Sequence, residues 1–356
     1  MNERISTLSH LILPLLEWFR DNQRTLPWRS DPTPYHVWVS EIMLQQTRVA
    51  AVLGYYRRFM EALPTVADLA QVEKDQLLKL WQGLGYYNRA RNLQKAARQI
   101  MEQFGGQFPR SYPDLLSLAG VGDYTAGAIA SIAFGLPEPA VDGNVLRVVT
   151  RITGDPSDIS QAATKKVIRA ALAEVIPLQA PGDFNQALME LGALVCLPNG
   201  APDCAHCPAH GFCAAHLTGK TAQIPVKGAK KPRKIEERTV YLLFHCGQVA
   251  LRRRPAKGLL AGLWEFPNEV VGSAESAGWG LDLTQAEVCG VGRHIFTHRE
   301  WHMTGKQLFL TNETLPEGWV WADEKAFCET YAVPNAFSAF LPAVESYFAQ
   351  WRGGLS

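Results

Sequence analysis

The stretch from residue 114 to residue 151 constrains the fold of this chain more than any other part of it. Its pattern predicts a short helix over 114–119, the tight turn Gly120-Val121-Gly122, and a helix of small residues over 124–134. Glycines on both sides of one apolar residue let two helices approach closely and leave backbone N–H groups pointing outward at a helix start. Such a helix start can receive a phosphate without a charged side chain. An ordinary helical hairpin, with the glycines ending its first helix, is the alternative.

Asp142 follows this hairpin, in the segment Val141-Asp142-Gly143-Asn144. Because a helical pattern starts near Asn144, the aspartate is predicted to cap that helix. A carboxylate at a helix N-terminus is held ionised by the helix dipole, which suits a group that faces a developing cation. The hairpin and this aspartate together resemble the DNA-backbone clamp and catalytic carboxylate of the helix-hairpin-helix DNA glycosylases.

Glu41 is the exception in an apolar pattern that starts at Thr33 and Pro34, a predicted N-cap and first helical residue. The pattern predicts one long helix over residues 34–60, with Trp38 one turn before the glutamate. Apolar neighbours raise the pKa of a carboxylate by desolvation, which keeps it protonated near neutral pH. A solvated position at the rim of the apolar face is the alternative, and this helix alone favours it.

Residues 81–92 read WQGLGYYNRARN, and their two glycines interrupt the helical period and set Tyr86 and Tyr87 on a loop or helix start. Exposed aromatic rings beside Arg89 and Arg91 suit stacking on bases, with phosphate contacts alongside. Inward packing of both tyrosines is the commoner alternative.

Composition sets loose limits on function. The length of 356 residues suits two or three domains, and the formal net charge of +1 is far from the basic balance of most nucleic-acid binders. The only basic cluster spans residues 227–238, so a DNA-binding hypothesis depends on local geometry. No apolar run approaches the length of a membrane span, and residues 6–22 predict an amphipathic helix rather than a signal peptide. We therefore expect a cytoplasmic protein without membrane contact, associated with the nucleoid if the source is bacterial.

Four cysteines lie within eighteen residues, with the spacing C-x7-C-x2-C-x5-C: Cys196, Cys204, Cys207 and Cys213. Four thiolates on one short loop in a reducing compartment indicate a metal centre, and disulfides are the weaker alternative. Spacing alone leaves both zinc and an iron–sulfur cluster open.

The chain changes character over residues 218–238, where glycines, two prolines and the basic cluster predict an interdomain linker. After it the apolar pattern switches to period two, and residues 239–245 and 248–252 predict a β-hairpin around Cys246-Gly247. Further strands and helices alternate to the end of the chain. We therefore expect a helical domain over 1–217 and a small α+β domain over 239–356.

The motifs SEIMLQQTRV, GLGYYNRARNL, GVGDYTAGAIASIAF and VDGNVLRV resemble those of the MutY family of adenine DNA glycosylases. The stretches GLLAGLWEFP and FTHREWH resemble that family's C-terminal, Nudix-like domain, so the resemblance covers nearly the full chain. It implies a multidomain fold, with an all-α helix-hairpin-helix glycosylase domain followed by an α+β Nudix-like domain. It also implies a monofunctional glycosylase, acting as a monomer, that excises adenine opposite 8-oxoguanine or guanine in double-stranded DNA.

The resemblance also implies a role for individual residues. Glu41 is expected to protonate the N7 atom of adenine, and ionised Asp142 to stabilise or attack the sugar cation that results. Tyr124 and Asn144 are expected to hold Asp142 and the sugar in place. A [4Fe-4S] cluster, rather than zinc, is expected on Cys196, Cys204, Cys207 and Cys213. The candidate DNA contacts are Arg29, the wedge residues Gln46 and Tyr86, the hairpin residues Gly120, Val121 and Gly122, and Thr297 and His298 as readers of 8-oxoguanine.

The chain departs from the family pattern in four places. Seven residues, rather than six, separate Cys196 from Cys204, and we expect the loop to absorb the extra residue without losing a ligand. Ala119 replaces a proline common before the hairpin, and Asp123 follows where a basic residue is frequent, so either change can loosen the phosphate clamp. The second domain lacks the acidic REUxEExGU run of Nudix pyrophosphatases, so we expect lesion recognition rather than nucleotide hydrolysis.

Related glycosylases that also cleave the DNA strand carry a lysine where this chain has Tyr124. Without that amine there is no efficient Schiff-base nucleophile, which argues for little or no lyase activity. Two alternatives remain: an endonuclease III-like glycosylase-lyase, and a DNA-binding iron–sulfur protein without catalysis. The hairpin and the cysteines suit the non-catalytic alternative equally well, and only Glu41 and Asp142 discriminate against it.

Overall fold

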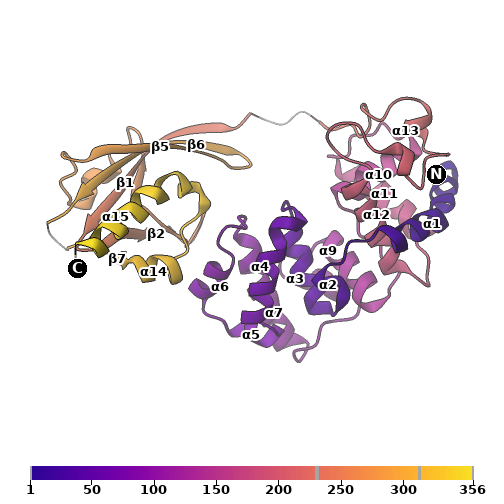
Figure 1. Ribbon diagram of the computed structural model, residues 1–356. Coiled ribbons are helices and arrows are strands. Elements are labelled where there is room, and N and C mark those ends of the chain that lie inside the picture. The colour runs from indigo at the N-terminus through magenta and orange to yellow at the C-terminus, as the bar shows by residue number, and fades with distance from the viewer. Residues whose placement is uncertain (1, 229–231, 312–313, 355–356) are drawn as a thin grey trace. The chain divides into compact units, whose positions relative to one another are not determined.

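The computed structural model describes residues 2–228, 232–311 and 314–354 (Figure 1). The chain forms two compact units, Met1–Gln71 with Arg91–Ala229 and Val72–Ala90 with Lys230–Ser356. The first unit is helical, and the second is built on a β-sheet. The multidomain fold expected from the sequence, all-α followed by α+β, is confirmed.

The first unit is helical. Its helices are α1 (Asn2–Asn22), α2 (Pro27–Ser30), α3 (Pro34–Leu44), α4 (Val49–Ala62), α5 (Val66–Gln71), most of α7 (Asn88–Gln103), α8 (Tyr112–Ser117), α9 (Asp123–Ala128), α10 (Gly143–Thr153), α11 (Ala162–Val175), α12 (Pro181–Leu194) and α13 (Ala214–Leu217). One apolar core in this unit joins α1 with the helices from α10 to α13.

Helix α10 lies at the centre of this unit, and α1, α11 and α12 pack against it. The predicted apolar face of α1 is confirmed, since Leu8, Leu11 and Leu15 are fully buried there. Burying side chains of this size contributes about 1.5–3 kcal/mol each before conformational entropy is subtracted. The helix begins at Asn2, four residues earlier than the sequence predicts.

The single helix predicted over residues 34–60 is wrong, because the structure has two helices there. Helix α3 ends at Leu44 and α4 begins at Val49, and between them Gln46 takes a left-handed backbone conformation with φ of 58°. Left-handed backbone cannot continue a right-handed helix, so the chain turns at this residue. The N-terminal prediction is confirmed, since the Thr33 hydroxyl accepts a hydrogen bond from the His36 N–H at 3.2 Å.

The predicted hairpin is formed by α8 and α9, and α9 continues as a π-helical turn over Ile129–Ala133. The first helix lies two residues earlier than predicted, at Tyr112–Ser117. Asp142 caps α10 as predicted, because its Oδ1 atom accepts a hydrogen bond from the Val145 N–H at 2.7 Å.

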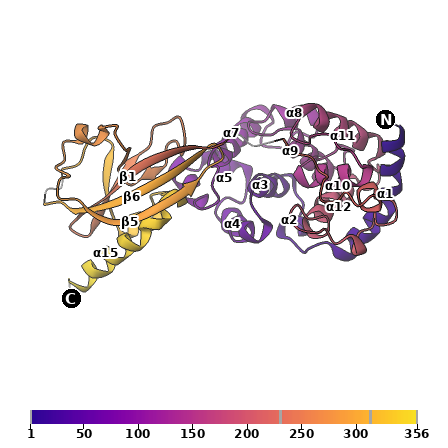
Figure 2. The same ribbon diagram turned by 90° about the horizontal axis from the view of Figure 1, so that it is seen from above.

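The second unit contains a seven-stranded mixed sheet with the central order β3-β2-β1-β6-β5, in which β4 pairs with β1 and β7 with β2. The central strands β1 and β6 run parallel, and the remaining pairs are antiparallel (Figure 2). The strands are β1 (Lys234–His245), β2 (Gln248–Arg253), β3 (Trp264–Glu265), β4 (Asn268–Val270), β5 (Glu287–Ile295), β6 (Arg299–Phe309) and β7 (Trp319–Asp323).

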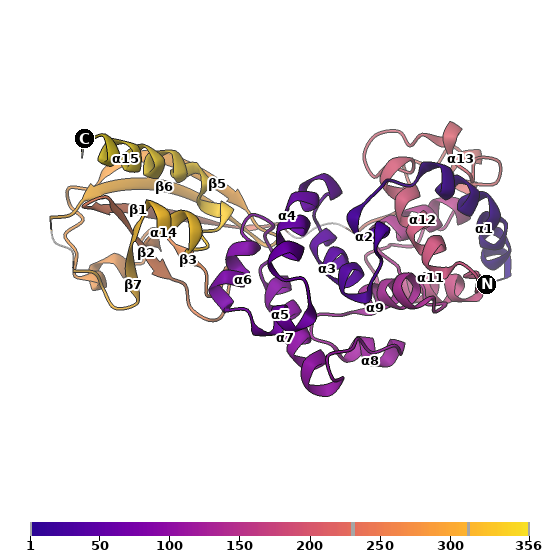
Figure 3. The same ribbon diagram turned by 60° about the horizontal axis from the view of Figure 1, so that its bottom comes forward.

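The predicted hairpin around Cys246-Gly247 is confirmed as β1 and β2, with both turn residues at positive φ as a two-residue turn requires. Helices α14 (Glu324–Glu329) and α15 (Leu341–Gly353) lie on the same side of the sheet (Figure 3). Their apolar residues, with those of the short helix Asn335–Phe340, form the main core of this unit. Helix α6 (Lys74–Leu80) also belongs to this unit, far from it in sequence.

Candidate active site and cysteine pocket

Glu41 lies buried on α3, only 6 % exposed, with fully buried Trp38 one turn before it. Burial raises the pKa of the Glu41 carboxyl to about 7, and the negative charge of Asp142 adds to the rise. A hydrogen bond from Tyr124 and the charge of Arg29 act in the opposite direction. The solvated alternative is therefore wrong, and Glu41 can donate a proton near neutral pH.

Tyr124, in the first turn of α9, directs its hydroxyl at Glu41. The hydroxyl donates a hydrogen bond to the Glu41 carboxylate and lies 3.2 Å from the Met189 sulfur. Burial and the two nearby carboxylates raise the pKa of Tyr124 well above its ordinary value, so the phenol stays a donor. We expected this side chain to hold Asp142, whereas its hydrogen bond goes to Glu41.

Asp142 takes part in a network at the N-terminus of α10. Its Oδ2 atom accepts a hydrogen bond from the Asn144 amide at 2.8 Å, the partner that the sequence predicts. Burial raises the pKa of Asp142, while the hydrogen bonds from Val145 and Asn144 and the charge of Arg147 lower it. The pKa of Asp142 is nevertheless raised overall, so the expectation that the helix start holds this carboxyl ionised is not met, although these donors favour the ionised form.

Arg29, a predicted DNA contact, is fixed within the first unit by an ion pair with Glu190. Its guanidinium donates to Glu190 at 2.9 Å and to Gln186 at 3.0 Å, both on α12. Glu190 is 1 % exposed and also accepts three hydrogen bonds from Arg24, two from its guanidinium and one from its backbone N–H. These arginines hold the pKa of Glu190 at about 2, so it stays ionised.

The sequence analysis missed three members of this cluster: Arg24, Gln186 and Glu190. The available signal was a glutamate in the apolar pattern FNQALMELGAL, at a position that an α-helix buries. A buried carboxylate requires cationic partners, but one sequence does not identify which arginines supply them.

The two predicted wedge residues share an unusual backbone conformation. Gln46 has φ of 58° and Tyr86 has φ of 46°, and among the described residues only five that are not glycine have positive φ. Such conformations cost about 1 kcal/mol or more and tend to persist at functional sites. Tyr86 is 48 % exposed, whereas Tyr87 is buried, so the tyrosine pair divides between the two orientations considered.

The hairpin turn requires a glycine at position 120, whereas position 122 has ordinary backbone and open space around it. Gly120 has φ of 76°, and a Cβ atom there would lie 2.6 Å from the Asn92 side chain. Gly122 has no atom within 4 Å of a Cβ position, so the start of α9 is open to an approaching group. Val121 between them is buried. This arrangement can receive a phosphate on backbone N–H groups.

The two hairpin residues that differ from the family pattern, Ala119 and Asp123, each form a hydrogen bond with a neighbouring side chain. The Ala119 N–H, a group that proline lacks, donates to the Gln99 side-chain oxygen at 2.7 Å. The Asp123 carboxylate accepts a hydrogen bond from the Tyr112 hydroxyl at 2.9 Å. These contacts join the turn to α7 and α8 and offset the loosening that the substitutions imply.

Thr297 and His298 lie at the exposed tip between β5 and β6. The tip is closed by a hydrogen bond from the Phe296 N–H to the Arg299 carbonyl at 2.8 Å. Thr297 Oγ1 lies 3.3 Å from the Tyr86 hydroxyl, within the same unit. The side chains of a predicted wedge and a predicted lesion reader therefore meet, although 211 residues separate them.

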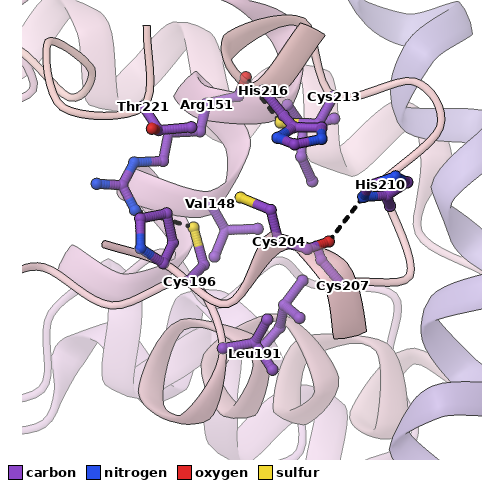
Figure 4. Close-up of a pocket in the computed structure, with 13 residues that line it drawn as sticks. Val148, Arg151, Leu191, Cys196, Cys204, Cys207, His210, Cys213, His216 and Thr221 are labelled. Carbon is purple, nitrogen blue, oxygen red and sulfur yellow. Dashed lines mark hydrogen bonds between the residues drawn. The ribbon is translucent and has the colours of Figure 1, made fainter. Parts of the chain in front are cut away.

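The four clustered cysteines line one pocket, together with Val148, Arg151, Leu191, His210 and His216 (Figure 4). All four are free thiols, and the pocket has about 380 Å³ of atom-free space, part of it open to solvent. Cys196 follows α12, while Cys213 caps α13. Arg151 of α10 reaches into the pocket, with its Nη1 atom 3.3 Å from the Cys196 sulfur.

The longer first spacing is accommodated in a loop whose middle is exposed, although its residue Pro202 lines the pocket. The Asp203 N–H donates to the Val195 carbonyl at 3.0 Å and closes the loop that contains the extra residue. The middle of that loop, around Gly200 with φ of 79°, is exposed. Cys196 consequently keeps its place beside the other three cysteines.

Burial makes three thiols of this pocket harder to ionise. Burial raises the pKa of Cys207 to about 12 and raises those of Cys204 and Cys213, and the neighbouring thiols reinforce these shifts. Within the described ranges, no three His, Cys, Asp or Glu side chains converge closely enough to hold one ion. Tetrahedral zinc would bring its thiolates to about 4 Å from one another, given Zn–S bonds of about 2.3 Å. Four thiols around one pocket are a donor set that can hold a metal centre.

Helix α10 connects this pocket with the carboxylates. Arg147 donates to the Cys196 carbonyl at 2.7 Å and to the Asn144 side-chain oxygen at 2.8 Å. Since Asn144 in turn donates to Asp142, the wall of the pocket and the capping aspartate belong to one hydrogen-bond network.

The fold and this site define a helix-hairpin-helix DNA repair protein. Residues 39–177 match the HhH-GPD superfamily base excision DNA repair protein family, and residues 239–343 match the NUDIX domain. Among solved structures, a thermostable thymine-DNA glycosylase is 27% identical over 61% of this chain and 98% of its own, with a TM-score of 0.53. A trapped endonuclease III–DNA covalent intermediate is 25% identical over 60% of this chain and 98% of its own, with a TM-score of 0.52.

The curated relatives show to which family of glycosylases the chain belongs. The adenine DNA glycosylase of Mus musculus is 35% identical over 96% of this chain and 79% of its own length. The adenine DNA glycosylase of Homo sapiens is 35% identical over 90% of this chain and 71% of its own length. The one of Buchnera aphidicola subsp. Baizongia pistaciae is 38% identical over 71% of this chain and 72% of its own length. The chain belongs to the adenine DNA glycosylase family. Across the described residues, no helix is both long and apolar enough to cross a membrane.

The raised pKa of Glu41 predicts a pH limb for base release from DNA. The proton is present below about pH 7 and lost above it, so the single-turnover rate should fall as pH rises through about 7. Because the Tyr124 hydrogen bond lowers the pKa of Glu41, Tyr124→Phe should move this limb to higher pH. Tyr112→Phe, whose hydroxyl bonds to Asp123, should leave it in place. If Tyr124→Phe leaves the pH of this limb unchanged, Glu41 is not the group that produces it.

Proposed function

We propose that this protein is a monofunctional glycosylase that removes adenine opposite 8-oxoguanine or guanine from double-stranded DNA in base excision repair. The observation that carries the proposal is the pair of carboxylates, a buried Glu41 with a pKa of about 7 and Asp142 at the start of α10. Acid-assisted loss of a purine needs a proton donor for the base and a negative charge for the sugar cation. Burial raises the pKa of both carboxyls, but only Asp142 accepts hydrogen bonds from Val145 and Asn144, which favour its ionised form.

The proposed reaction starts with a flipped adenine, at a cost of about a few kcal/mol for lost stacking and pairing. Glu41 donates its proton to N7 of the base, and the glycosidic electrons leave with the protonated adenine. Asp142 then stabilises the oxocarbenium-like sugar, or forms a bond to it that water later replaces. Asn144 holds Asp142 by its amide, and Tyr124 holds the Glu41 carboxyl.

Tyr124 also supports the absence of strand cleavage. It lies where related glycosylase-lyases carry their Schiff-base lysine, and a buried phenol with a raised pKa is a poor nucleophile toward the sugar. The endonuclease III-like alternative is therefore less favoured.

For DNA recognition we propose that the open start of α9, around Gly120, Val121 and Gly122, binds a backbone phosphate. Gln46 and Tyr86 act as wedges at the mispair, while Thr297 and His298 read 8-oxoguanine. Arg29 acts near the extrahelical base through its fixed position beside Glu190. In this arrangement the first unit catalyses, and the second, which includes Val72–Ala90, recognises the lesion, all within a monomer. The linker expected over 218–238 is shorter in the structure, since Ile224 is buried in the first unit's core and β1 begins at Lys234.

We further propose that Cys196, Cys204, Cys207 and Cys213 hold a [4Fe-4S] cluster. The four free thiols around one pocket and the side chain of Arg151 near Cys196 support this assignment. When bound, such a cluster supplies the positive charge that keeps buried thiolates ionised and fixes the fold of its loop.

The catalytic proposal predicts the effect of replacing Glu41. Glu41→Gln removes the proton donor with little change in shape, so adenine release should fall at least ~100-fold, the usual worth of a general acid. The substrates are duplexes with adenine opposite 8-oxoguanine, guanine and thymine, and the readout is strand breakage after alkali. Glu61→Gln, at an exposed position on α4, is the matched control.

Three outcomes would count against the proposal. Full activity in Glu41→Gln would exclude this acid. Strand cleavage without alkali, with trapping of the enzyme on DNA by borohydride, would favour the glycosylase-lyase. Binding of the mispair without any base release by the unmodified protein would favour the non-catalytic alternative.

The lesion-reading proposal predicts a change in preference. Replacing both Thr297 and His298 by alanine should slow excision opposite 8-oxoguanine more than opposite guanine, by about 1–3 kcal/mol for one or two lost hydrogen bonds. Thr304→Ala, at an exposed position on β6, should leave the ratio of the two single-turnover rates unchanged. An unaltered ratio in the double variant would remove this role from the tip.

The cluster proposal predicts a brown protein after anaerobic purification, with about four irons per chain and broad visible absorption. Cys196→Ser should lose the colour and the affinity for DNA, while Cys246→Ser, which changes an exposed thiol of the second unit, should keep both. A colourless folded protein containing one zinc would overturn the assignment.

A further inference from the structure

The segment Val72–Ala90 belongs to the second compact unit, although the first unit contains the chain on both sides of it. It comprises α6 and the loop that carries Tyr86, and α6 lies beside α14 (Figure 1). Several hydrogen bonds join this segment to the rest of the second unit.

Lys79, the second-last residue of α6, provides the first anchor. Its ammonium donates hydrogen bonds to the Phe327 carbonyl at 3.2 Å and to the Tyr331 carbonyl at 3.0 Å. These carbonyls lie at the C-terminal end of α14, where orphan acceptors and the negative end of the helix dipole favour a cation. One lysine therefore satisfies two backbone acceptors that lie far away in the sequence.

Gln82 and Gly83 provide the second anchor, directly before the tyrosine loop. The Gln82 side-chain amide donates to the Val333 carbonyl at 2.8 Å. In return, the Asn335 side-chain amide donates to the Gly83 carbonyl at 3.3 Å. Side chains from both segments thus bond to the other segment's backbone, a pattern that fixes position more strictly than apolar contact does.

The loop beyond these anchors is held by hydrogen bonds of its own. The Trp81 indole N–H donates to the Gly85 carbonyl at 3.0 Å, and Arg89 donates to the Leu84 and Gly85 carbonyls at 3.1 Å and 3.2 Å. These bonds hold the left-handed backbone of Tyr86, which an unsupported loop would relax. A displacement of the anchors is therefore passed on to the Tyr86 ring.

We propose that Lys79 and Gln82 are positioning residues, which fix the Tyr86 loop on the second unit so that Tyr86 and Thr297 meet the mispair as one preassembled reader. This role rests on the proposed function, in which Tyr86 and Thr297 contact the mispair. The 3.3 Å approach of the Tyr86 hydroxyl to Thr297 Oγ1 is the outcome of this anchoring. The specificity for the base opposite adenine consequently depends on two side chains that touch neither DNA nor the base.

The test uses the full-length protein with Lys79→Met, Gln82→Leu and the double variant. Methionine keeps most of the lysine stem but cannot donate, and Lys74→Met, at an exposed position of the same helix, is the matched control. Two lost hydrogen bonds predict about a tenfold fall in the ratio of single-turnover rates opposite 8-oxoguanine and opposite guanine. Lys79→Arg, which can donate to both carbonyls, should restore the ratio.

Two further measurements separate positioning from a loss of fold. Hydrogen exchange should become faster in residues 82–87 of Lys79→Met, while the core of α10 keeps its protection. In the background of Thr297→Ala with His298→Ala, Lys79→Met should change the ratio little further, since both sets of changes act through the same contact. Equal slowing opposite both bases, or an unchanged ratio with faster exchange, would overturn the proposal.

The result also distinguishes the two proposals made for this region. An unchanged ratio in Thr297→Ala with His298→Ala removes lesion reading by the tip, whatever Lys79 does. A changed ratio there, together with an unchanged ratio in Lys79→Met with Gln82→Leu, leaves lesion reading intact and removes the anchoring role.

Discussion

The burial of two arginines on α10 is the constraint on which the catalytic unit depends. Arg147 and Arg151 are each 4 % exposed, and their guanidinium groups donate to backbone carbonyls of α12 and of the segments that follow it. A buried arginine without such acceptors would cost several kcal/mol, so these segments are held in place by the helix that presents Asp142. Gly192 allows this approach, since a Cβ atom there would lie 2.6 Å from the Asn144 side chain.

Charge in this unit is set by surroundings rather than by residue type. Glu41 and Glu190 are both buried glutamates, yet their pKa values are about 7 and about 2. Two arginines bind Glu190, whereas Glu41 receives one phenol and lies near another carboxylate. The same desolvation therefore yields a neutral acid in one place and a permanent anion in the other. Ionised Glu190 in turn holds Arg29 in place, and the positive charge of Arg29 lowers the pKa of Glu41.

Features set by nearby residues were predictable from the sequence. The apolar face of α1, the caps at Thr33 and Asp142, and the β1–β2 hairpin all follow from local spacing. The break between α3 and α4 was not predictable, since LQQTRV contains neither glycine nor proline and the left-handed Gln46 is imposed by its surroundings. Through-space partners were also missed, because no local pattern relates Tyr124 to Glu41 or assigns Val72–Ala90 to the second unit.

Strained backbone at Gln46 and Tyr86 has a consequence for how such a site can evolve. A left-handed residue that is not glycine persists only where its neighbours over-determine it, and Tyr86 has Trp81 and Arg89 for that purpose. Replacement by glycine would relieve the strain, but it would remove the ring that the loop exposes. The strain is therefore retained together with the ring. Neighbouring side chains also support the helix-hairpin-helix turn. Gln99 accepts a hydrogen bond from the Ala119 N–H, and Tyr112 donates one to the Asp123 carboxylate.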